Sequence, residues 1–101
     1  MLVRIVRMSF QEDQITAFLA IFNASKPKIR SFPGCRHLEL LRDLDQPHCF
    51  VTYSHWETPE ALDAYRQSDL FRTTWAATKK LFSARATAFS VEKLEEVIIE
   101  N

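Results

Sequence analysis

Histidines are the side chains in this chain that could act as general bases near neutral pH. His37 and His55 fall in alternating segments typical of strands, whereas His48 follows Pro47 in a turn and is expected to be solvated. On the register that we assume, His37 and His55 lie on neighbouring strands but opposite faces, so they would not act together. A strand histidine can also be a surface or interface residue. No pair of histidines or cysteines has metal-ligand spacing, and we predict no metal site.

Aromatic residues form the second chemical group, with 12 in the chain. Tyr65 and Trp75 fall on helical stripes with Phe71, where a phenol and an indole N–H could be aimed at an oxygen of a ligand. We therefore predict Tyr65, His37 and His55 as catalytic residues. The predicted substrate contacts are Trp56, Trp75, Phe22, Phe71 and Arg85. Tyr65 and Trp75 could instead be core residues with backbone partners, and Trp56 could be a packing anchor.

Arginines on the predicted strands are candidates for contact with an anion. Arg85 lies on the last predicted strand, and Arg4 and Arg7 interrupt the first. They could reach an anionic ligand or a dimer interface, or they could be solvated charges at a sheet edge.

Composition excludes several classes of function. A single glycine, Gly34, rules out the glycine-rich loops that bind nucleotide phosphates, and we predict no cofactor. The formal net charge of zero removes the basic surface expected of a nucleic-acid-binding protein. No apolar run is long enough for a membrane span. Cys35 and Cys49 are too far apart for a disulfide on the assumed register, so we expect free thiols and a cytoplasmic location.

The elements that must position these residues follow from hydrophobic periodicity. Strand patterns cover 2–8, 35–42, 49–56 and 84–91, and helical patterns run from 12 to 32 and again after Thr58 and Ser68. Pro27 should kink or interrupt the first helix. The order is β-α-β-β-α-β, which predicts a ferredoxin-like α+β sandwich with an antiparallel sheet.

The predicted sheet is apolar on both faces, although helices can cover only one. On the assumed register, one face carries Leu38, Leu40, Val51 and Tyr53, and the other carries Leu41, Phe50 and Trp56. An apolar face left in water indicates a partner surface, and we expect a homodimer with sheet against sheet. Residues 1–92 would form the domain, and the tail 93–101 could pack on the dimer partner.

Several runs of sequence resemble the antibiotic biosynthesis monooxygenase (ABM) superfamily. They are FVTYSHWE at 50–57, EALDAY at 60–65, SDLF at 68–71, and RSFPGC at 30–35 leading into LEL at 38–40. The resemblance covers about residues 2–92 in the same element order. It implies a dimeric α+β barrel with one pocket per subunit between the helices and the sheet.

Departures from the family's branches narrow the function that the resemblance implies. The haem-degrading branch has an Asn on the first strand, which residues 2–8 lack, and a His at the position that matches Trp75. The quinol-oxidising branch often has a His where Tyr65 stands. Anthrone-type oxygenases, which need no cofactor, use Trp, Tyr, Asn and Arg around an aromatic substrate, and Trp56, Tyr65, Trp75 and Arg85 are of these types.

Two functions follow as expectations. One is a cofactor-independent monooxygenase that oxidises a small aromatic quinol, anthrone or polyketide-like substrate with O2. The other is a dimeric small-molecule-binding or stress-related protein of the same fold without catalysis. An open pocket with Tyr65 and a histidine pointing inward would favour the first. A cleft filled by Phe18, Phe22, Phe71 and Trp75 would favour the second.

Overall fold

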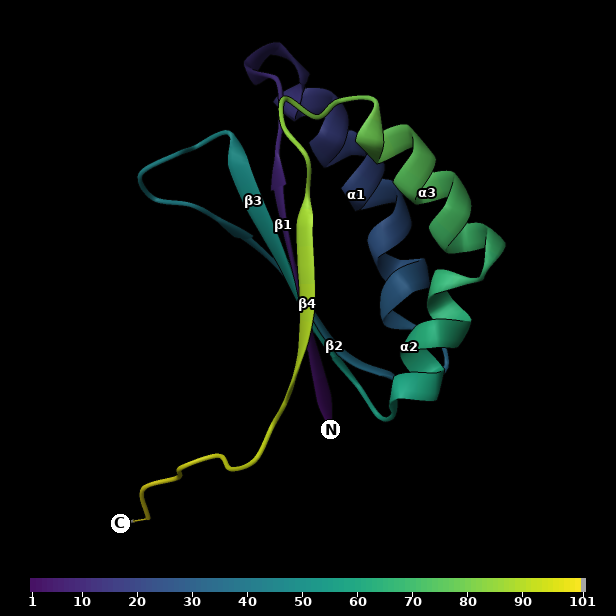
Figure 1. The fold of residues 1–101 in the computed structure, drawn as a ribbon, viewed down its shortest axis with the longest axis vertical. Coiled ribbons are helices and arrows are strands. Elements are labelled where there is room, and N and C mark those ends of the chain that lie inside the picture. The colour runs from purple at the N-terminus through teal and green to yellow at the C-terminus, as the bar shows by residue number, and fades with distance from the viewer. Residues whose placement is uncertain (101) are drawn as a thin grey trace.

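Four antiparallel strands and three helices make up the computed structural model, which describes residues 1–100. The elements are β1 (Leu2–Ser9), a short 3-10 turn η1 (Glu12–Gln14), α1 (Ile15–Arg30), β2 (Cys35–Arg42), β3 (Cys49–Trp56), α2 (Pro59–Arg66), α3 (Asp69–Lys79) and β4 (Thr87–Glu92). The strand order is β2-β3-β1-β4, and all three helices cover one face of the sheet (Figure 1). This confirms the predicted ferredoxin-like α+β fold.

Side-chain caps start the second and third helices where the sequence predicts them. The Thr58 side chain accepts a hydrogen bond from the backbone N–H of Ala61, and Pro59 occupies the first turn of α2. Ser68 caps α3 in the same way by accepting from Phe71. The two caps divide this segment into two helices, of which α2 packs on β3 and α3 packs beside α1.

The first helix departs from the prediction at Pro27. The structure shows α1 unbroken from Ile15 to Arg30, with Pro27 inside it. Phe18 before the proline and Ile29 after it are both buried. Packing on both sides of Pro27 therefore outweighs the loss of one backbone hydrogen bond, and the helix ends only at Ser31, which donates to the Pro27 carbonyl.

The predicted pairing of β2 with β3 was wrong by one residue. The observed partners include Leu38 with Ser54, Leu40 with Thr52, Leu41 with Val51 and His37 with His55. Leu38 and Leu40 therefore share the helix-covered face with Thr52 and Ser54 rather than with Val51 and Tyr53. Leu41 lies with Val51 on the outer face, whereas Phe50 and Trp56 belong to the core.

The connection between the two strands explains this difference. The carboxylate of Asp43 accepts hydrogen bonds from the backbone N–H groups of Asp45 and Gln46. The Asp43 N–H in turn bonds to the Cys49 carbonyl and closes the hairpin one residue later than assumed. A shift of one residue moves every side chain of a strand to the other face relative to its neighbour.

Two buried clusters join the helices to the sheet. The larger contains Met8, Phe10, Phe18 and Phe50, and the smaller contains Cys35, Trp56 and Leu62. The last strand, β4, is exposed along its length and pairs only with β1 at the edge of the sheet. The residues after β4 run away from the sheet on the side opposite the helices (Figure 1). No helix within residues 1–100 is long and apolar enough to cross a membrane.

Candidate functional site

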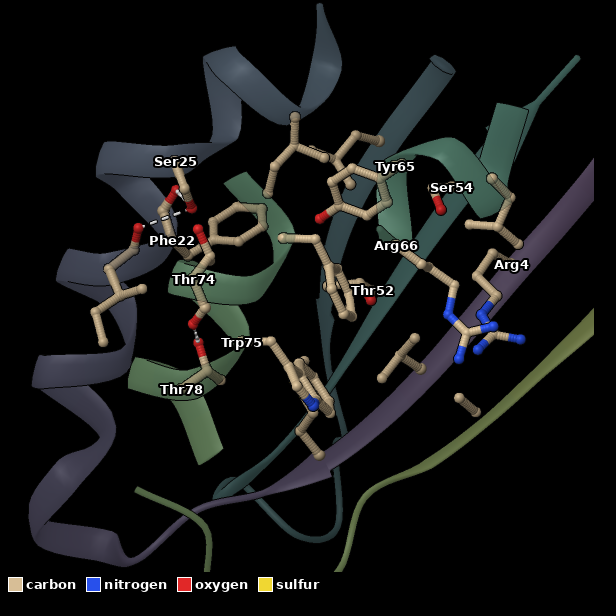
Figure 2. Close-up of a pocket in the computed structure, with 18 of the residues that line it drawn as sticks. Arg4, Phe22, Ser25, Thr52, Ser54, Tyr65, Arg66, Thr74, Trp75 and Thr78 are labelled. Atoms are coloured by element: carbon tan, nitrogen blue, oxygen red, sulfur yellow. Dashed lines mark hydrogen bonds between the residues drawn. The ribbon is translucent and has the colours of Figure 1, made fainter. Parts of the chain in front are cut away.

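A cavity of about 260 Å³ lies between the helices and the sheet, beside the β4 edge (Figure 2). Its lining is mostly apolar and comes from every helix and every strand. The lining residues are Arg4, Val6, Met8, Phe18, Ile21, Phe22, Ser25, Ile29, Leu38, Thr52, Ser54, Trp56, Leu62, Tyr65, Arg66, Phe71, Thr74, Trp75, Thr78 and Ala88. Among them only Arg66 and Ala88 are exposed, so the mouth of the cavity lies between the end of α2 and β4.

Aromatic rings form a continuous wall along this cavity. Tyr65 stacks on Trp56 and meets Phe71 edge to face, and Phe71 stacks on Trp75 with centroids 5.8 Å apart. The rings come from β3, α2 and α3. Because aromatic rings pack well on one another both face to face and edge to face, this wall suits an aromatic ring system.

The position of Tyr65 depends on close packing at the start of α2. Gly34 adopts φ +88°, a conformation that favours glycine, and a Cβ there would lie 2.5 Å from the Cβ of Ala61. The Gly34 carbonyl also accepts a hydrogen bond from the Glu57 N–H. Ala61 lies one helical turn before Tyr65, so this contact sets how far the Tyr65 ring enters the cavity.

The hydroxyl of Tyr65 points into the cavity (Figure 2) and has no hydrogen-bond partner among residues 1–100. Burial raises the pKa of Tyr65 to about 12, with a smaller contribution from the nearby Cys35 thiol. The phenol is therefore protonated at neutral pH. It can donate a hydrogen bond to a ligand oxygen, but it is not a base under these conditions.

Other hydroxyls in the lining differ in whether they can reach a ligand. Ser25 donates to the Ile21 carbonyl and Thr78 donates to the Thr74 carbonyl, so both are satisfied within their own helices. Ser54 accepts from the indole N–H of Trp56 at 3.0 Å, which fixes the indole against the sheet. The side chains of Tyr65, Thr52, Thr74 and Trp75 make no hydrogen bond within residues 1–100, so their neutral donors remain available to a ligand.

Two arginines supply the charge of the cavity. Arg4 extends from β1 and Arg66 from the last turn of α2, and their guanidinium groups converge at one end of the cavity (Figure 2). Arg4 also donates to the hydroxyl of Ser90 at 3.1 Å. Burial and the neighbouring Arg66 charge both lower the pKa of Arg4.

Five of the predicted site residues meet at this cavity. They are Tyr65, Trp56, Trp75, Phe22 and Phe71. Phe18 also lines it, and together these aromatic residues leave an open space rather than filling the cleft. Trp56 is 1% exposed, so it is a packing anchor as well as part of the wall.

The structure places three other predicted residues elsewhere. Arg85 lies before the start of β4 and does not line the cavity. His37 and His55 are on the outer face of the sheet, the face that the helices leave open. No histidine among residues 1–100 lines the cavity, so of the two inward-pointing groups that would favour an oxygenase only Tyr65 is present there.

The one-residue difference in register also changes the predicted placement of the two histidines on the sheet. His37 and His55 are direct cross-strand partners on one face, with ring centroids 4.9 Å apart, and not on opposite faces. His37 also lies 3.2 Å from a carboxylate oxygen of Glu39. Burial, followed by the nearby His37, lowers the pKa of His55, whose Nε2 is buried without a partner among residues 1–100.

Sequence reasoning missed Arg66 and favoured a solvated role for Arg4. Arg66 is the last residue of α2, where a cation interacts favourably with the helix dipole. A basic residue at this position is therefore common and does not by itself indicate a binding site. Arg4 shares the inner face of β1 with Val6 and Met8, and this alternation was the available signal. That signal becomes useful only once the cleft beside β4 is known to be open.

Thiols and metal ligands add no reactive centre in the part of the chain described. Cys35 and Cys49 are both buried and free, and burial raises the pKa of Cys35, which keeps its thiol protonated at neutral pH. No three His, Cys, Asp or Glu side chains within residues 1–100 form a group that could hold a metal ion.

Solved structures with the same fold cover almost the whole chain. A crystal structure named as an antibiotic biosynthesis monooxygenase is 21% identical, with a TM-score of 0.87, and the match covers 94% of this chain and 100% of the other. Rv0793 from Mycobacterium tuberculosis is 23% identical, with a TM-score of 0.87 and coverage of 96% and 98%. A protein from Deinococcus radiodurans is 19% identical, with a TM-score of 0.89 and coverage of 100% of both chains. At these identities the likeness establishes the fold.

Family membership comes from the sequence itself. No curated protein matches the chain. The family model described as antibiotic biosynthesis monooxygenase matches residues 1–77, which is most of the chain and includes β1, α1 and the aromatic wall. The chain therefore belongs to the antibiotic biosynthesis monooxygenase (ABM) family.

Proposed function

We propose that the protein is a monooxygenase that oxidises a small, electron-rich aromatic substrate, such as a quinol or an anthrone, with O2 and without a cofactor. The observation that carries this proposal is the aromatic-walled cavity into which the Tyr65 hydroxyl points. Family membership supports oxygenation at the level of the family. The electrons come from the substrate, whose anion is a strong enough reductant to react with dioxygen.

An anthrone illustrates the balance of the reaction. The substrate loses one proton from its methylene carbon, and the carbanion transfers one electron to O2, which gives a substrate radical and superoxide. These combine into a carbon–oxygen bond, and the protonated peroxide loses water to leave a carbonyl. The methylene is oxidised by four electrons, one oxygen atom enters the product and the other leaves as water.

The residues of the cavity favour the anionic form of the substrate. Tyr65 donates its hydrogen bond to the oxygen on which negative charge develops. The positive charges of Arg4 and Arg66 lower the pKa of a bound acid, since a nearby cation stabilises the conjugate base. The proton leaves through the mouth beside Arg66 to water. The apolar wall keeps bulk water from the peroxide.

Oxygen uptake tests the proposal directly. A panel of hydroquinones and anthrones is incubated with the protein in the presence of a metal chelator, and O2 consumption and quinone formation are measured. Stoichiometric consumption of one O2 per anthrone, unaffected by the chelator, is expected. No uptake above the rate without protein for any member of the panel would contradict the proposal.

Binding without catalysis is the second candidate, and one observation favours it. No histidine, aspartate or glutamate side chain in the described part of the chain lines the cavity, and the raised pKa of Tyr65 keeps its phenol protonated at neutral pH. A ligand whose own acidity is too low would then be held without reacting. Calorimetric binding of an aromatic ligand together with absent oxygen uptake would select this function.

We further propose that two copies associate through the outer face of the sheet. This face carries Leu41, Phe89 and Val91, which are 45%, 52% and 43% exposed, beside the His37 and His55 pair. The tail after β4 extends on the same side (Figure 1), and its exposed apolar residues, including Val97 and Ile98, would pack on the partner. Analytical ultracentrifugation should give a dimer for the natural chain and a monomer for Phe89→Glu. A monomeric natural chain at micromolar concentration would contradict this arrangement.

A further inference from the structure

The guanidinium groups of Arg4 and Arg66 lie together at one end of an otherwise apolar cavity (Figure 2). Neither has a carboxylate within salt-bridge distance among residues 1–100, although five other ion pairs occur there. Two like charges held close together without a counter-ion repel each other, and this repulsion contributes to the lowered pKa of Arg4.

Structural roles account for only part of this arrangement. Arg66 benefits from the negative end of the α2 dipole, but that benefit does not require it to approach another arginine. Arg4 uses one nitrogen of its guanidinium to bond Ser90, which leaves its other donors unassigned. Arg4 also lies on the inner face of β1, between Ser54 of β3 and Ser90 of β4, where an apolar side chain would pack against the cavity more favourably.

We propose that the Arg4 and Arg66 pair binds a carboxylate of the substrate, so that the ligand of this protein is an aromatic carboxylic acid. The inference rests on the proposed function in taking this cavity as the substrate site, and it adds the class of substrate. Guanidinium groups match a carboxylate through paired N–H donors, and the carboxylate neutralises the repulsion between the two arginines.

The carboxylate also orients the ring system. With the acid group held between Arg4 and Arg66 near the mouth, the aromatic body extends along the wall formed by Tyr65, Phe71 and Trp75. The Tyr65 hydroxyl points away from the arginines in Figure 2, so a substrate oxygen at the far end of the ring can accept its hydrogen bond. The two polar ends of the site thus define which carbon of the substrate meets O2.

Binding of a matched pair of unreactive probes tests this assignment. Isothermal titration calorimetry compares 2-naphthoate with 2-naphthamide, which has nearly the same shape but no charge. The protein should bind naphthoate at least about tenfold more tightly, because hydrogen bonds to a charged group are stronger than neutral ones. Arg4→Gln and Arg66→Gln should each bring the ratio of the two affinities close to one, while naphthamide binding persists and shows that the cavity is intact.

Charge and position are separated by two further variants. Arg66→Lys keeps the charge and should retain part of the preference for naphthoate. Arg85→Gln removes an arginine outside the cavity and should leave the preference unchanged. Arg66→Gln also removes the repulsion between the two guanidinium groups, so this variant should melt at a temperature no lower than that of the natural chain.

Several results would overturn the inference. Equal affinity for naphthoate and naphthamide in the natural chain would do so, as would loss of the preference in Arg85→Gln to the same extent as in Arg66→Gln. Binding of neither probe at millimolar concentration would also overturn it. Preferential binding of the acid without oxygen uptake would support the carboxylate site and contradict the oxygenase function. Oxygen uptake with neutral quinols and no preference for naphthoate would support the oxygenase function and contradict the carboxylate site.

Discussion

The phenol ring of Tyr65 stacks on the indole of Trp56, with ring centroids 4.9 Å apart and planes inclined by 25°. The indole is held in turn by its hydrogen bond to Ser54 on the same strand. Tyr65 therefore keeps its position through the ring, and its hydroxyl is free for a ligand. Because the ring packs and the hydroxyl has no partner among residues 1–100, deletion of the hydroxyl tests its role without disturbing the packing.

Tyr65→Phe should lower oxygen uptake by about tenfold to a hundredfold, because it removes a donor to the developing oxyanion. The free energy of unfolding should change by less than about 1 kcal/mol, since the hydroxyl has no protein partner among residues 1–100. Steady-state oxygen consumption and urea unfolding measure the two effects. Tyr53→Phe on the outer face is the matched control, and an equal loss of activity in that variant would rule out a specific role for Tyr65.

The pH profile of the natural chain provides a second measure of the same group. Because the pKa of Tyr65 is raised to about 12, deprotonation of the phenol should not reduce activity anywhere below about pH 11. A loss of activity with an apparent pKa near 10 that is absent in Tyr65→Phe would show that the phenol ionises at its ordinary pKa and would contradict its burial in the cavity.

Filling the cavity should prevent ligand binding without removing any polar group that contacts the ligand. Thr74 on α3 lines the cavity, whereas its neighbour Thr73 is exposed and bonds to the Asp69 carbonyl. Thr74→Trp should abolish calorimetric binding of 2-naphthamide, and Thr73→Trp should leave it unchanged. Thr74→Trp also costs stability, by about 1–3 kcal/mol if the neighbours must move. Unchanged binding in Thr74→Trp would place the ligand elsewhere.

The sequence was sufficient to predict the order and type of the elements because hydrophobic periodicity and capping residues are local signals. The caps at Thr58 and Ser68 and the helical stripe through Phe71 and Trp75 are confirmed by the structure. The register of β2 against β3 depends on how the Asp43 carboxylate closes the turn, and turn closure is a three-dimensional contact. The assignment of His37 and His55 to opposite faces was wrong for that reason.

The aromatic residues predicted for the site line the cavity, whereas the predicted arginine, Arg85, does not. An aromatic residue on an apolar stripe faces the interior in nearly every arrangement of the helices, so Tyr65 and Trp75 could be placed without the structure. Arg66 follows Tyr65 on α2, and only the opening between α2 and β4 turns this helix-terminal cation towards a cavity. Arg85 was favoured instead because its place in the sequence suggested a strand, and it lies before β4.

The paired histidines of the outer face should make stability depend on pH. The groups around His55 are His37 and Glu39 from β2, Tyr53 from its own strand, and Lys93 and Glu96 from the tail. Burial and His37 lower the pKa of His55 in the folded protein, whereas in the unfolded chain it stays near the ordinary value of about 6.5.

The sign of the effect follows from proton binding. As the pH falls through about 6.5, the unfolded chain binds a proton at His55 before the folded protein does, so stability declines. The urea midpoint of the natural chain should therefore fall more between pH 7.5 and pH 5.5 than that of His55→Gln, at equal protein concentration. His48→Gln in the connecting turn is the control and should follow the natural chain. Identical pH dependence in His55→Gln and the natural chain would contradict the shift.

Gly34 links the fold to the site, and its replacement should be costly. Gly34→Ala introduces a side chain at φ +88° and brings its Cβ within 2.5 Å of the Cβ of Ala61, so we expect a loss of about 2 kcal/mol or more in the free energy of unfolding. Ala61→Gly in the same chain removes the overlap but not the backbone strain, and it should recover part of that loss. The double-mutant cycle, measured by urea unfolding, should therefore show a favourable coupling between the two substitutions. Because Ala61 lies one turn before Tyr65, ligand affinity should fall in Gly34→Ala and rise again in the double variant. Additive effects of the two substitutions on the free energy of unfolding would show that the close contact between Gly34 and Ala61 does not position α2.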